Sequence, residues 1–379
     1  MSNSNTCSRG GTLNGGFLAA PLAVYIHIPY CRTICPYCDF VRRPLPNGAV
    51  PVPFVDAVCS EIENCEGPDA AETVFFGGGT PSLVAPESLE EIFAALHSRF
   101  TFTNPEITIE ANPDDVDAAL ASAWRSIGVN RISLGVQSFN DAALHYLGRR
   151  HDAARAHRAC EIVRERFENW SLDLIFGAPP VSAWEETLRT CVELAPPHVS
   201  AYGLTYEEGT PFGKRKSEAV DEETSLTMYR QARAALTDYA RYEISNFARP
   251  GCECRHNLVY WRNEEYAGFG PGAYSYVNRV RARNATKTDE YLSAPGKKDE
   301  TLHLSDREIR VETVIQYLRL RAGLRNRAYL ERFGNTVRED FGVVIDGLIR
   351  RGLIAEDGDG IRPTELGFEL NNEIGLALV

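Results

Sequence analysis

The sequence has few basic residues for its acidic content: 40 Lys and Arg stand against 52 Asp and Glu, for a net charge of −12. A nucleic-acid binder needs a basic face, so we expect no nucleic-acid partner. Long hydrophobic runs are absent too, and the apolar stretch 16–29 is too short and too interrupted by proline to span a bilayer. No basic segment precedes that stretch, which disfavours a signal peptide. We therefore expect a cytoplasmic protein without an integral membrane segment.

Cysteine is plentiful, with 10 residues, but the chain of 379 residues is core-rich and carries no secretory signal. Free or metal-bound thiols in a reducing compartment are therefore expected rather than a disulfide framework. The start of the chain is rich in Ser, Asn and Gly, and we expect a disordered leader over 1–22. Arg9 stands there without any acidic residue before position 17, which leaves an organelle transit peptide as a weaker alternative.

From residue 23 to about 205, short apolar runs alternate with longer amphipathic stretches, which indicates βα units around a parallel sheet. Six units are present rather than eight, so the α/β fold predicted for 23–245 is a partial, TIM-like (β/α)6 barrel. The predicted strands are 24–28, 73–76, 107–109, 131–136, 171–176 and 199–204. The predicted helices are 54–65, 87–100, 115–127, 153–167, 184–194 and 221–240.

The end of the chain has a different pattern, and we predict a smaller, mostly helical domain of winged-helix character over 305–379. Helices over 309–324 and 337–351 precede a hairpin centred on 357–360, and a last helix starts near 365. This segment holds 11 basic and 13 acidic residues, so a structural or partner-docking role is favoured over DNA binding. Between the two domains, 246–304 is expected to form a connecting region whose part 279–304 is charged and partly irregular.

Three cysteines, Cys31, Cys35 and Cys38, follow the first predicted strand with the spacing C-x3-C-x2-C. This spacing gathers three thiolates within one short loop. Three thiolates are one short of the four that close a [4Fe–4S] cluster, so one iron stays open for a small molecule. The pattern therefore predicts a cluster that acts on a bound ligand rather than one that only transfers electrons.

Polar residues and glycines follow the other predicted strands. A glycine run ends in Gly78, Gly79 and Thr80, and its bare backbone can approach a ligand closely. The further polar residues at strand ends or just beyond are Glu110, Gln137, Arg149 and Asp173. The alternative for Asp173 is an internal salt bridge, because a buried charge must be paired, and Glu110 and Gln137 could be hydrogen-bonded polar residues of the barrel. Together they favour one shared ligand that carries an amine, a carboxylate and a diol, as S-adenosylmethionine does.

With these motifs, the chain from Tyr25 to its end resembles the radical S-adenosylmethionine enzymes of the oxygen-independent coproporphyrinogen III oxidase group. The resemblance implies that the three cysteines bind a [4Fe–4S] cluster whose open iron chelates the methionine part of S-adenosylmethionine. It also implies a 5′-deoxyadenosyl radical after one-electron cleavage of the sulfonium. The residues that match cofactor contacts of the family are Tyr25, Tyr37, Gly78, Gly79, Thr80, Glu110, Gln137, Arg149 and Asp173. We assign Arg149 to the carboxylate, and Gln137 or Asp173 to the ribose hydroxyls.

Two features resemble the heme-chaperone (HemW) branch of this family rather than its oxidase branch. Phe40 stands where the oxidases continue with a fourth cysteine, and His256 opens an H-N-x-x-Y-W element over 256–261. The resemblance implies that His256 contacts heme, that an acceptor hemoprotein receives it, and that a flavodoxin- or ferredoxin-like protein donates electrons. The alternatives are oxidative decarboxylation of coproporphyrinogen III and, less favoured, radical chemistry on an unrelated substrate. Whether the protein is an enzyme is thus left open.

The chemistry of the H-N-x-x-Y-W element is compatible with heme. Imidazole is a good axial ligand of heme iron, and Tyr260 and Trp261 offer flat apolar area to a macrocycle. The equal alternative is that His256 caps a turn while Trp261 belongs to the core. The chain has no C-x-x-C-H motif for covalent heme attachment, and Cys252 and Cys254 are expected to be free thiols.

Overall fold

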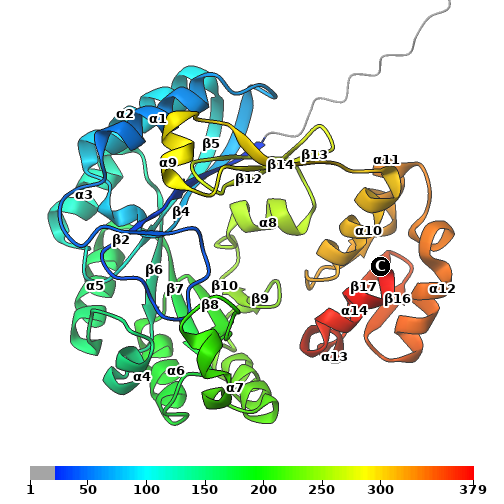
Figure 1. Ribbon diagram of the computed structural model, residues 1–379. Coiled ribbons are helices and arrows are strands. Elements are labelled where there is room, and N and C mark those ends of the chain that lie inside the picture. The colour runs from blue at the N-terminus through cyan, green and yellow to red at the C-terminus, as the bar shows by residue number, and fades with distance from the viewer. Residues whose placement is uncertain (1–21) are drawn as a thin grey trace, which may run out of the picture.

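The computed structural model describes residues 22–379. It contains a twelve-stranded curved sheet with helices over its outer face, and a smaller C-terminal unit on the far side of a short helix, α8 (Figure 1). The leader predicted over 1–22 lies outside the described residues except for Leu22, which begins the first strand. The predicted α/β class and the partial barrel are confirmed.

Six parallel strands stand side by side in the order in which they occur along the chain. They are β1 (Leu22–Ile28), β4 (Ala70–Gly78), β5 (Thr101–Ala111), β6 (Arg131–Gln137), β7 (Asn169–Phe176) and β8 (His198–Gly203). The helices between and after them are α1 (Val52–Glu63), α2 (Pro86–Arg99), α3 (Ala118–Ile127), α4 (Asp141–Tyr146), α5 (Ala153–Arg166), α6 (Ala183–Leu194) and α7 (Glu222–Ala235). Because the strands are parallel, all their carboxyl ends lie at one edge of the sheet.

Both edges of the parallel sheet are extended by other strands. On one side β11 (Tyr266–Phe269) runs parallel to β1 and is followed by an antiparallel meander; on the other side β10 (Asn246–Ala248) pairs antiparallel with β8. The remaining elements of these edges are β9 (Ala240–Arg241), α8 (Arg255–Trp261), β12 (Tyr274–Val277), β13 (Val280–Asn284), α9 (Thr288–Ser293) and β14 (Lys298–His303). Two short strands and two 3-10 turns complete this part: β2 (Tyr30–Cys31), β3 (Arg43–Pro44), η1 (Pro81–Leu83) and η2 (Phe212–Glu218).

The connection over 279–304, expected to be partly irregular, is regular except for the short stretches 285–287 and 294–297 between its elements. This segment forms β13, α9 and β14, and the two strands pair antiparallel. All six residues of β14 are exposed. A strand without a buried face lacks the alternation of apolar and polar residues by which strands are found in a sequence.

The six parallel strands have an apolar outer face and a polar inner face. In β6, Ile132, Leu134 and Val136 are buried in the main hydrophobic core, whereas Arg131 and Ser133 line a cavity inside the barrel. A closed TIM barrel fills its interior with branched apolar side chains. Here the inner face has polar residues and lines a cavity that a ligand can fill.

The C-terminal unit has the winged-helix outline expected from the sequence. Its elements are α10 (Asp306–Tyr317), β15 (Leu324–Arg325), α11 (Asn326–Phe333), α12 (Val337–Arg350), β16 (Ile354–Asp357), β17 (Gly360–Pro363), α13 (Glu365–Glu369) and α14 (Asn371–Leu378). Capping boxes at Ser305 and Thr336 start α10 and α12. The helix predicted over 309–324 is too long: α10 ends at Tyr317, and the chain turns again at Gly323, which has a φ of +64°. A Cβ there would lie 2.1 Å from the Ile361 carbonyl oxygen.

The C-terminal unit packs on the barrel through arginines. Arg241, at the end of β9, is 5% exposed and lies 4.1 Å above the Phe368 ring. Glu365 accepts from Arg321 at 2.8 Å, from Arg241 at 2.5 Å and from Arg233 at 2.6 Å. Partial burial raises the pKa of Glu365, but these three arginines outweigh it and hold the pKa at about 2. Bidentate and clustered arginine–carboxylate pairs fix geometry well. How the chain divides into domains at 245 and 304 stays a prediction.

Candidate functional site

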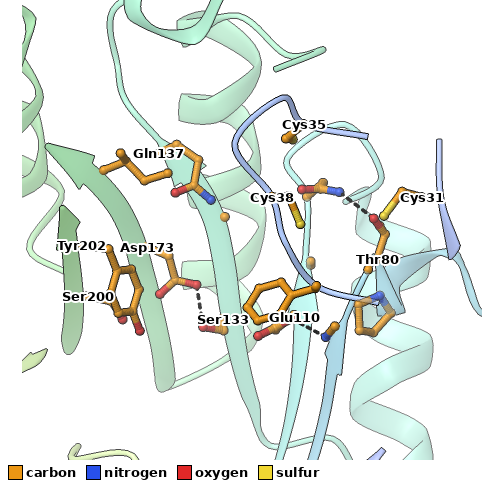
Figure 2. A pocket seen from close by; sticks show the side chains of 18 of the residues that line it. Cys31, Cys35, Cys38, Thr80, Glu110, Ser133, Gln137, Asp173, Ser200 and Tyr202 are labelled. Atoms are coloured by element: carbon orange, nitrogen blue, oxygen red, sulfur yellow. Dashed lines mark hydrogen bonds between the residues drawn. The ribbon is translucent and has the colours of Figure 1, made fainter. Parts of the chain in front are cut away.

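The barrel encloses a cavity of about 740 Å³, a size typical of small-molecule and cofactor sites. Every residue predicted for the site lies in its lining, although these residues come from segments up to 231 positions apart, from Tyr25 to His256. Figure 2 shows Cys31, Cys35 and Cys38 on one side of the cavity and Asp173 and Tyr202 on the other. The structure thus brings the predicted residues together, while their individual roles stay predictions.

The three cysteines lie in the loop that follows β1. Cys31 belongs to β2, where its carbonyl accepts from the Leu45 N–H at 2.8 Å, and the Cys38 N–H donates to the Cys35 carbonyl at 3.2 Å. All three thiols are free. Burial raises the pKa of Cys31 to about 11 and also raises that of Cys38. A coordinating metal reverses this effect, because it deprotonates the thiol that binds it.

The three thiols are not arranged as the ligands of a single metal ion. Within residues 22–379, no three His, Cys, Asp or Glu side chains converge closely enough to ligate one metal ion. A cubane cluster needs a wider arrangement, since each thiolate binds a different iron. Three free thiols along one wall of a cavity, beside a partly buried arginine, fit such a cluster with one open iron.

Arg149 connects the cysteine loop to β6. Its Nη1 lies 3.4 Å from the Cys35 sulfur, and its Nη2 donates to the Gly135 carbonyl at 2.9 Å and to Asn112 Oδ1. Burial by itself lowers the pKa of Arg149, but Tyr37 and Cys35 more than offset this, so the guanidinium stays charged. A fixed cation next to the cysteines is well placed for a carboxylate bound at the open iron.

Gln137 ends β6 with a φ of +68°, in the left-handed region that residues other than glycine rarely adopt. The pairing of β6 with β7 also shifts register between Leu134 and Gln137. This bulge is a costly local feature that turns a side chain, as bulges near active sites do. Gly135 leaves space for the side chains of Gln137 and Arg149. A Cβ at Gly135 would lie 3.0 Å from Gln137 Nε2 and 3.6 Å from Arg149 Nη2.

Two carboxylates face the middle of the cavity. Glu110 Oε2 accepts from the Gly78 N–H at 3.1 Å, and burial, followed by repulsion from Asp173, raises the pKa of Glu110 to about 8. Asp173 accepts from the hydroxyls of Ser133 at 2.7 Å and Ser171 at 3.0 Å. Asp173 can accept hydrogen bonds from an amine or a diol of a ligand. The charge of Glu110 depends on the ligand that is bound.

The glycine run meets protein atoms as well as the cavity. The Gly79 N–H donates to the Ile28 carbonyl at 2.7 Å, and a Cβ on Gly79 would lie 2.8 Å from the carbonyl oxygens of Ile28 and Tyr30. A Cβ on Gly78, which has a φ of +108°, would lie 2.4 Å from the His27 ring. We expect these glycines to allow close approach of a ligand. They also allow close packing of the protein itself, including the loop that carries Cys31. Thr80 Oγ1 accepts from Asn112 at 3.3 Å.

The two predicted tyrosines occupy different walls. The Tyr25 hydroxyl lies 3.0 Å from His27 Nδ1, and the other nitrogen of that imidazole lies 2.7 Å from the Val41 carbonyl. Tyr25 also stacks with Phe75, with ring centroids 6.3 Å apart. Tyr37 belongs to the cysteine loop and lies near Arg149. Its burial, together with Cys35, raises its pKa above the usual value.

His256 lies in α8 and is 2% exposed. Its Nδ1 is 2.8 Å from the Thr73 hydroxyl and its Nε2 is 2.9 Å from the Tyr260 hydroxyl. Burial, with a contribution from Arg131, lowers its pKa to about 3, so the imidazole is neutral. Both ring nitrogens are thus engaged, and ligation of a metal through Nε2 requires Tyr260 to move.

Several lining residues were missed by the sequence reasoning. They lie on the inner faces of β5 to β8 and on adjoining segments: Asn112, Arg131, Ser133, His198, Ser200, Tyr202 and Asn246. The missed signal is a period-two alternation within predicted buried strands, for example R-I-S-L-G-V-Q in β6. Parallel strands buried on both faces are usually continuous apolar runs. A polar residue at every second position therefore indicates an inner face that lines a cavity.

The chain was then compared with known proteins. The family model described as the Radical SAM superfamily matches residues 25–191, and the one described as the HemN C-terminal domain matches residues 304–370. The heme chaperone HemW of Lactococcus lactis is 32% identical, covering 94% of this chain and 97% of the relative. HemW of Bacillus subtilis is 33% identical, covering 93% and 97%. HemW of Escherichia coli is 39% identical over 71% of this chain and 74% of the relative.

Among solved structures, coproporphyrinogen III oxidase (HemN) from Escherichia coli has a TM-score of 0.81 over 95% of this chain and 90% of its own, at 22% identity. This likeness shows the fold. The barrel, the cysteine loop and the matching family model together define a radical SAM protein. The cofactors of that class are a [4Fe–4S] cluster and S-adenosylmethionine. The full-length relatives then show that the chain belongs to the HemW family. Among residues 22–379, the structure has no helix long and apolar enough to span a membrane.

Proposed function

We propose that this protein is a heme chaperone, which binds heme and transfers it to an acceptor hemoprotein. The observation that carries the proposal is that His256, Tyr260 and Trp261 line the same cavity as the three cysteines. Full-length relatives named heme chaperones support it. Phe40 supports it as well: it occupies the position of the oxidases' further cysteine and is 61% exposed.

The proposal assigns each part of the two cofactors to residues of this chain. Cys31, Cys35 and Cys38 would hold the [4Fe–4S] cluster, Arg149 the carboxylate of S-adenosylmethionine, and Gln137 or Asp173 its ribose hydroxyls. The remaining contacts proposed for this cofactor are Tyr25, Tyr37, Gly78, Gly79, Thr80 and Glu110. When bound, the cluster and S-adenosylmethionine supply reductive one-electron chemistry. The protein's residues orient the ligands and keep bulk water away from the inner barrel.

Heme would approach from the side of α8. The neutral imidazole of His256 is in the protonation state that a metal ligand needs. Its Nε2 hydrogen bond to Tyr260, at 2.9 Å, must break before Nε2 can bind iron. Loss of one neutral hydrogen bond costs about 1 kcal/mol, which is small beside the strength of an axial ligand bond.

A heme titration tests this proposal. Cluster-reconstituted protein is titrated anaerobically with heme, and the absorption bands are followed for the wild type, His256→Ala and His303→Ala. His303 lies in the exposed strand β14 and serves as the matched control. We expect His256→Ala to lose the shift of the heme bands while His303→Ala keeps it. An unchanged titration of His256→Ala removes the proposed role of that residue, and absence of heme binding by the wild type refutes the function.

The rival function is oxidative decarboxylation of coproporphyrinogen III, because the oxidase shares the fold. Anaerobic incubation with coproporphyrinogen III, a reductant and S-adenosylmethionine distinguishes the two. Formation of protoporphyrinogen would favour the oxidase over the chaperone.

The acceptor hemoprotein, a flavodoxin- or ferredoxin-like electron donor and a cytoplasmic location belong to the same proposal. The location is supported by the nine cysteines of residues 22–379, which form no disulfide.

A further inference from the structure

Arg131 is a buried cation to which neither the sequence motifs nor the cofactor assignments give a role. It begins β6, is 1% exposed and lines the cavity. Its Nε has no hydrogen-bond partner, and within the described part of the chain its guanidinium forms neither a hydrogen bond nor an ion pair. Burial disfavours the charged form of Arg131, but Cys254, Glu106, Tyr242 and Asp173 more than offset this and hold its pKa above the usual value, so the guanidinium stays charged. An unpaired arginine inside a ligand cavity therefore indicates an anionic group that is supplied by a ligand.

The carboxylates near Arg131 are committed to other donors. Glu106 accepts from the backbone N–H groups of Arg255 and His256, each at 3.1 Å, and from the Cys254 thiol at 3.6 Å. It thereby caps the start of α8. Asp173 accepts from two serine hydroxyls. Both lower the electrostatic cost of the Arg131 charge from a distance, but neither contacts its donors.

The strand neighbour of Arg131 has an unsatisfied polar atom too. Thr108 pairs with Arg131 in the register of β5 and β6, and its buried hydroxyl has no partner among residues 22–379. His198 and His256 also lie near Arg131 and are neutral, because burial and then the arginine itself lower their pKa values. Arg131 is consequently the positive charge of this part of the cavity.

S-adenosylmethionine does not supply this anion. Its single carboxylate belongs beside the cluster, where Arg149 binds Gly135 and lies next to Cys35. Arg131 precedes Gly135 by four residues in β6. At the rise of a β-strand, the two positions are about 13 Å apart. The aromatic wall near Arg131 includes Phe75, His256 and Tyr260, with centroid distances of 5.1 Å between consecutive rings. A second ligand with a flat apolar body and a carboxylate matches this combination.

We propose that Arg131 binds a propionate carboxylate of the porphyrin ligand inside the barrel. This inference rests on the proposed heme-chaperone function and adds the orientation of the ligand, with a propionate pointing toward the beginning of β6. The arginine fork suits a carboxylate, since two parallel N–H donors can bind its two oxygens.

The test compares heme with heme dimethyl ester, whose propionates are esterified. Both are titrated anaerobically, in the same detergent, into the cluster-reconstituted full chain. For the wild type we expect a dissociation constant about tenfold to a hundredfold lower for heme, as one or two charge-assisted hydrogen bonds give. In Arg131→Met this ratio should fall to about one. Arg327→Met serves as the matched control, because Arg327 is an exposed residue of α11 paired with Glu331, and it should keep the ratio of the wild type.

Equal binding of heme and its ester by the wild type overturns the inference while the chaperone function stands. An undiminished ratio in Arg131→Met overturns it as well. Should Arg131→Met fail to fold, Arg131→Lys keeps the charge but loses the paired donors, and a ratio equal to that of the wild type is again a refutation. Absence of binding of either compound by the wild type refutes the proposed function itself.

Discussion

Glu110 provides a quantitative prediction for the protein without its cofactors. Its pKa is raised to about 8 by burial and by Asp173, from an ordinary value of 4.5. Between these two values the native state therefore binds more protons than the unfolded state. The free energy of unfolding then falls as the pH rises from 4.5 to 8 and no longer changes through this group above 8. Glu110→Gln removes the effect and keeps an oxygen that can accept from Gly78.

The size of the effect follows from the shift. A difference of about 3.5 pKa units corresponds to roughly 5 kcal/mol at 1.36 kcal/mol per unit, and relaxation and water in the cavity reduce this to roughly 2–3 kcal/mol. We expect Glu110→Gln to gain this much stability over the wild type at pH 8.5 relative to pH 5. Urea unfolding of the apo protein, followed by circular dichroism at several pH values, measures the difference.

The control is Glu161→Gln, on the exposed side of α5, which should follow the wild type at every pH. A difference between Glu110→Gln and the wild type that stays constant with pH would refute the reasoning. So would a wild type whose stability relative to Glu110→Gln increases between pH 5 and 8.

Two further predictions concern the cluster and its ligand. Gly79→Ala places a Cβ 2.8 Å from the carbonyl oxygens of Ile28 and Tyr30, so we expect a loss of about 1–3 kcal/mol in urea unfolding and less iron and sulfide bound per chain; full stability would show that the loop can shift. Arg149→Met should weaken S-adenosylmethionine binding by about tenfold to a hundredfold in equilibrium dialysis of the reconstituted protein. Unchanged affinity at equal cluster content would remove Arg149 from the carboxylate site.

The barrel and the cluster loop could be predicted because they depend on local patterns. The six parallel strands are short apolar runs between amphipathic helices. These periodic patterns are local, so they can be recognised in the sequence without knowledge of distant contacts. The three cysteines are at most seven positions apart, so their convergence is a property of one loop. Glu110 was found because it closes a predicted strand, where polar residues can reach a ligand. Asp173 was found because a charge inside an apolar run must be paired or bound, and it lies within β7 rather than at its end.

Non-local packing decided the rest. The two hydrogen bonds that occupy His256 come from Thr73, 183 residues away, and from Tyr260 on the next turn of α8. Glu106, a carboxylate near Arg131, accepts instead from the first turn of α8, which a distant part of the chain supplies. The left-handed Gln137 depends on a register shift between two strands. Such contacts follow from the relative placement of distant segments, and the sequence by itself determined which chemistry the chain carries but not which of its charges the folded protein leaves free for a ligand.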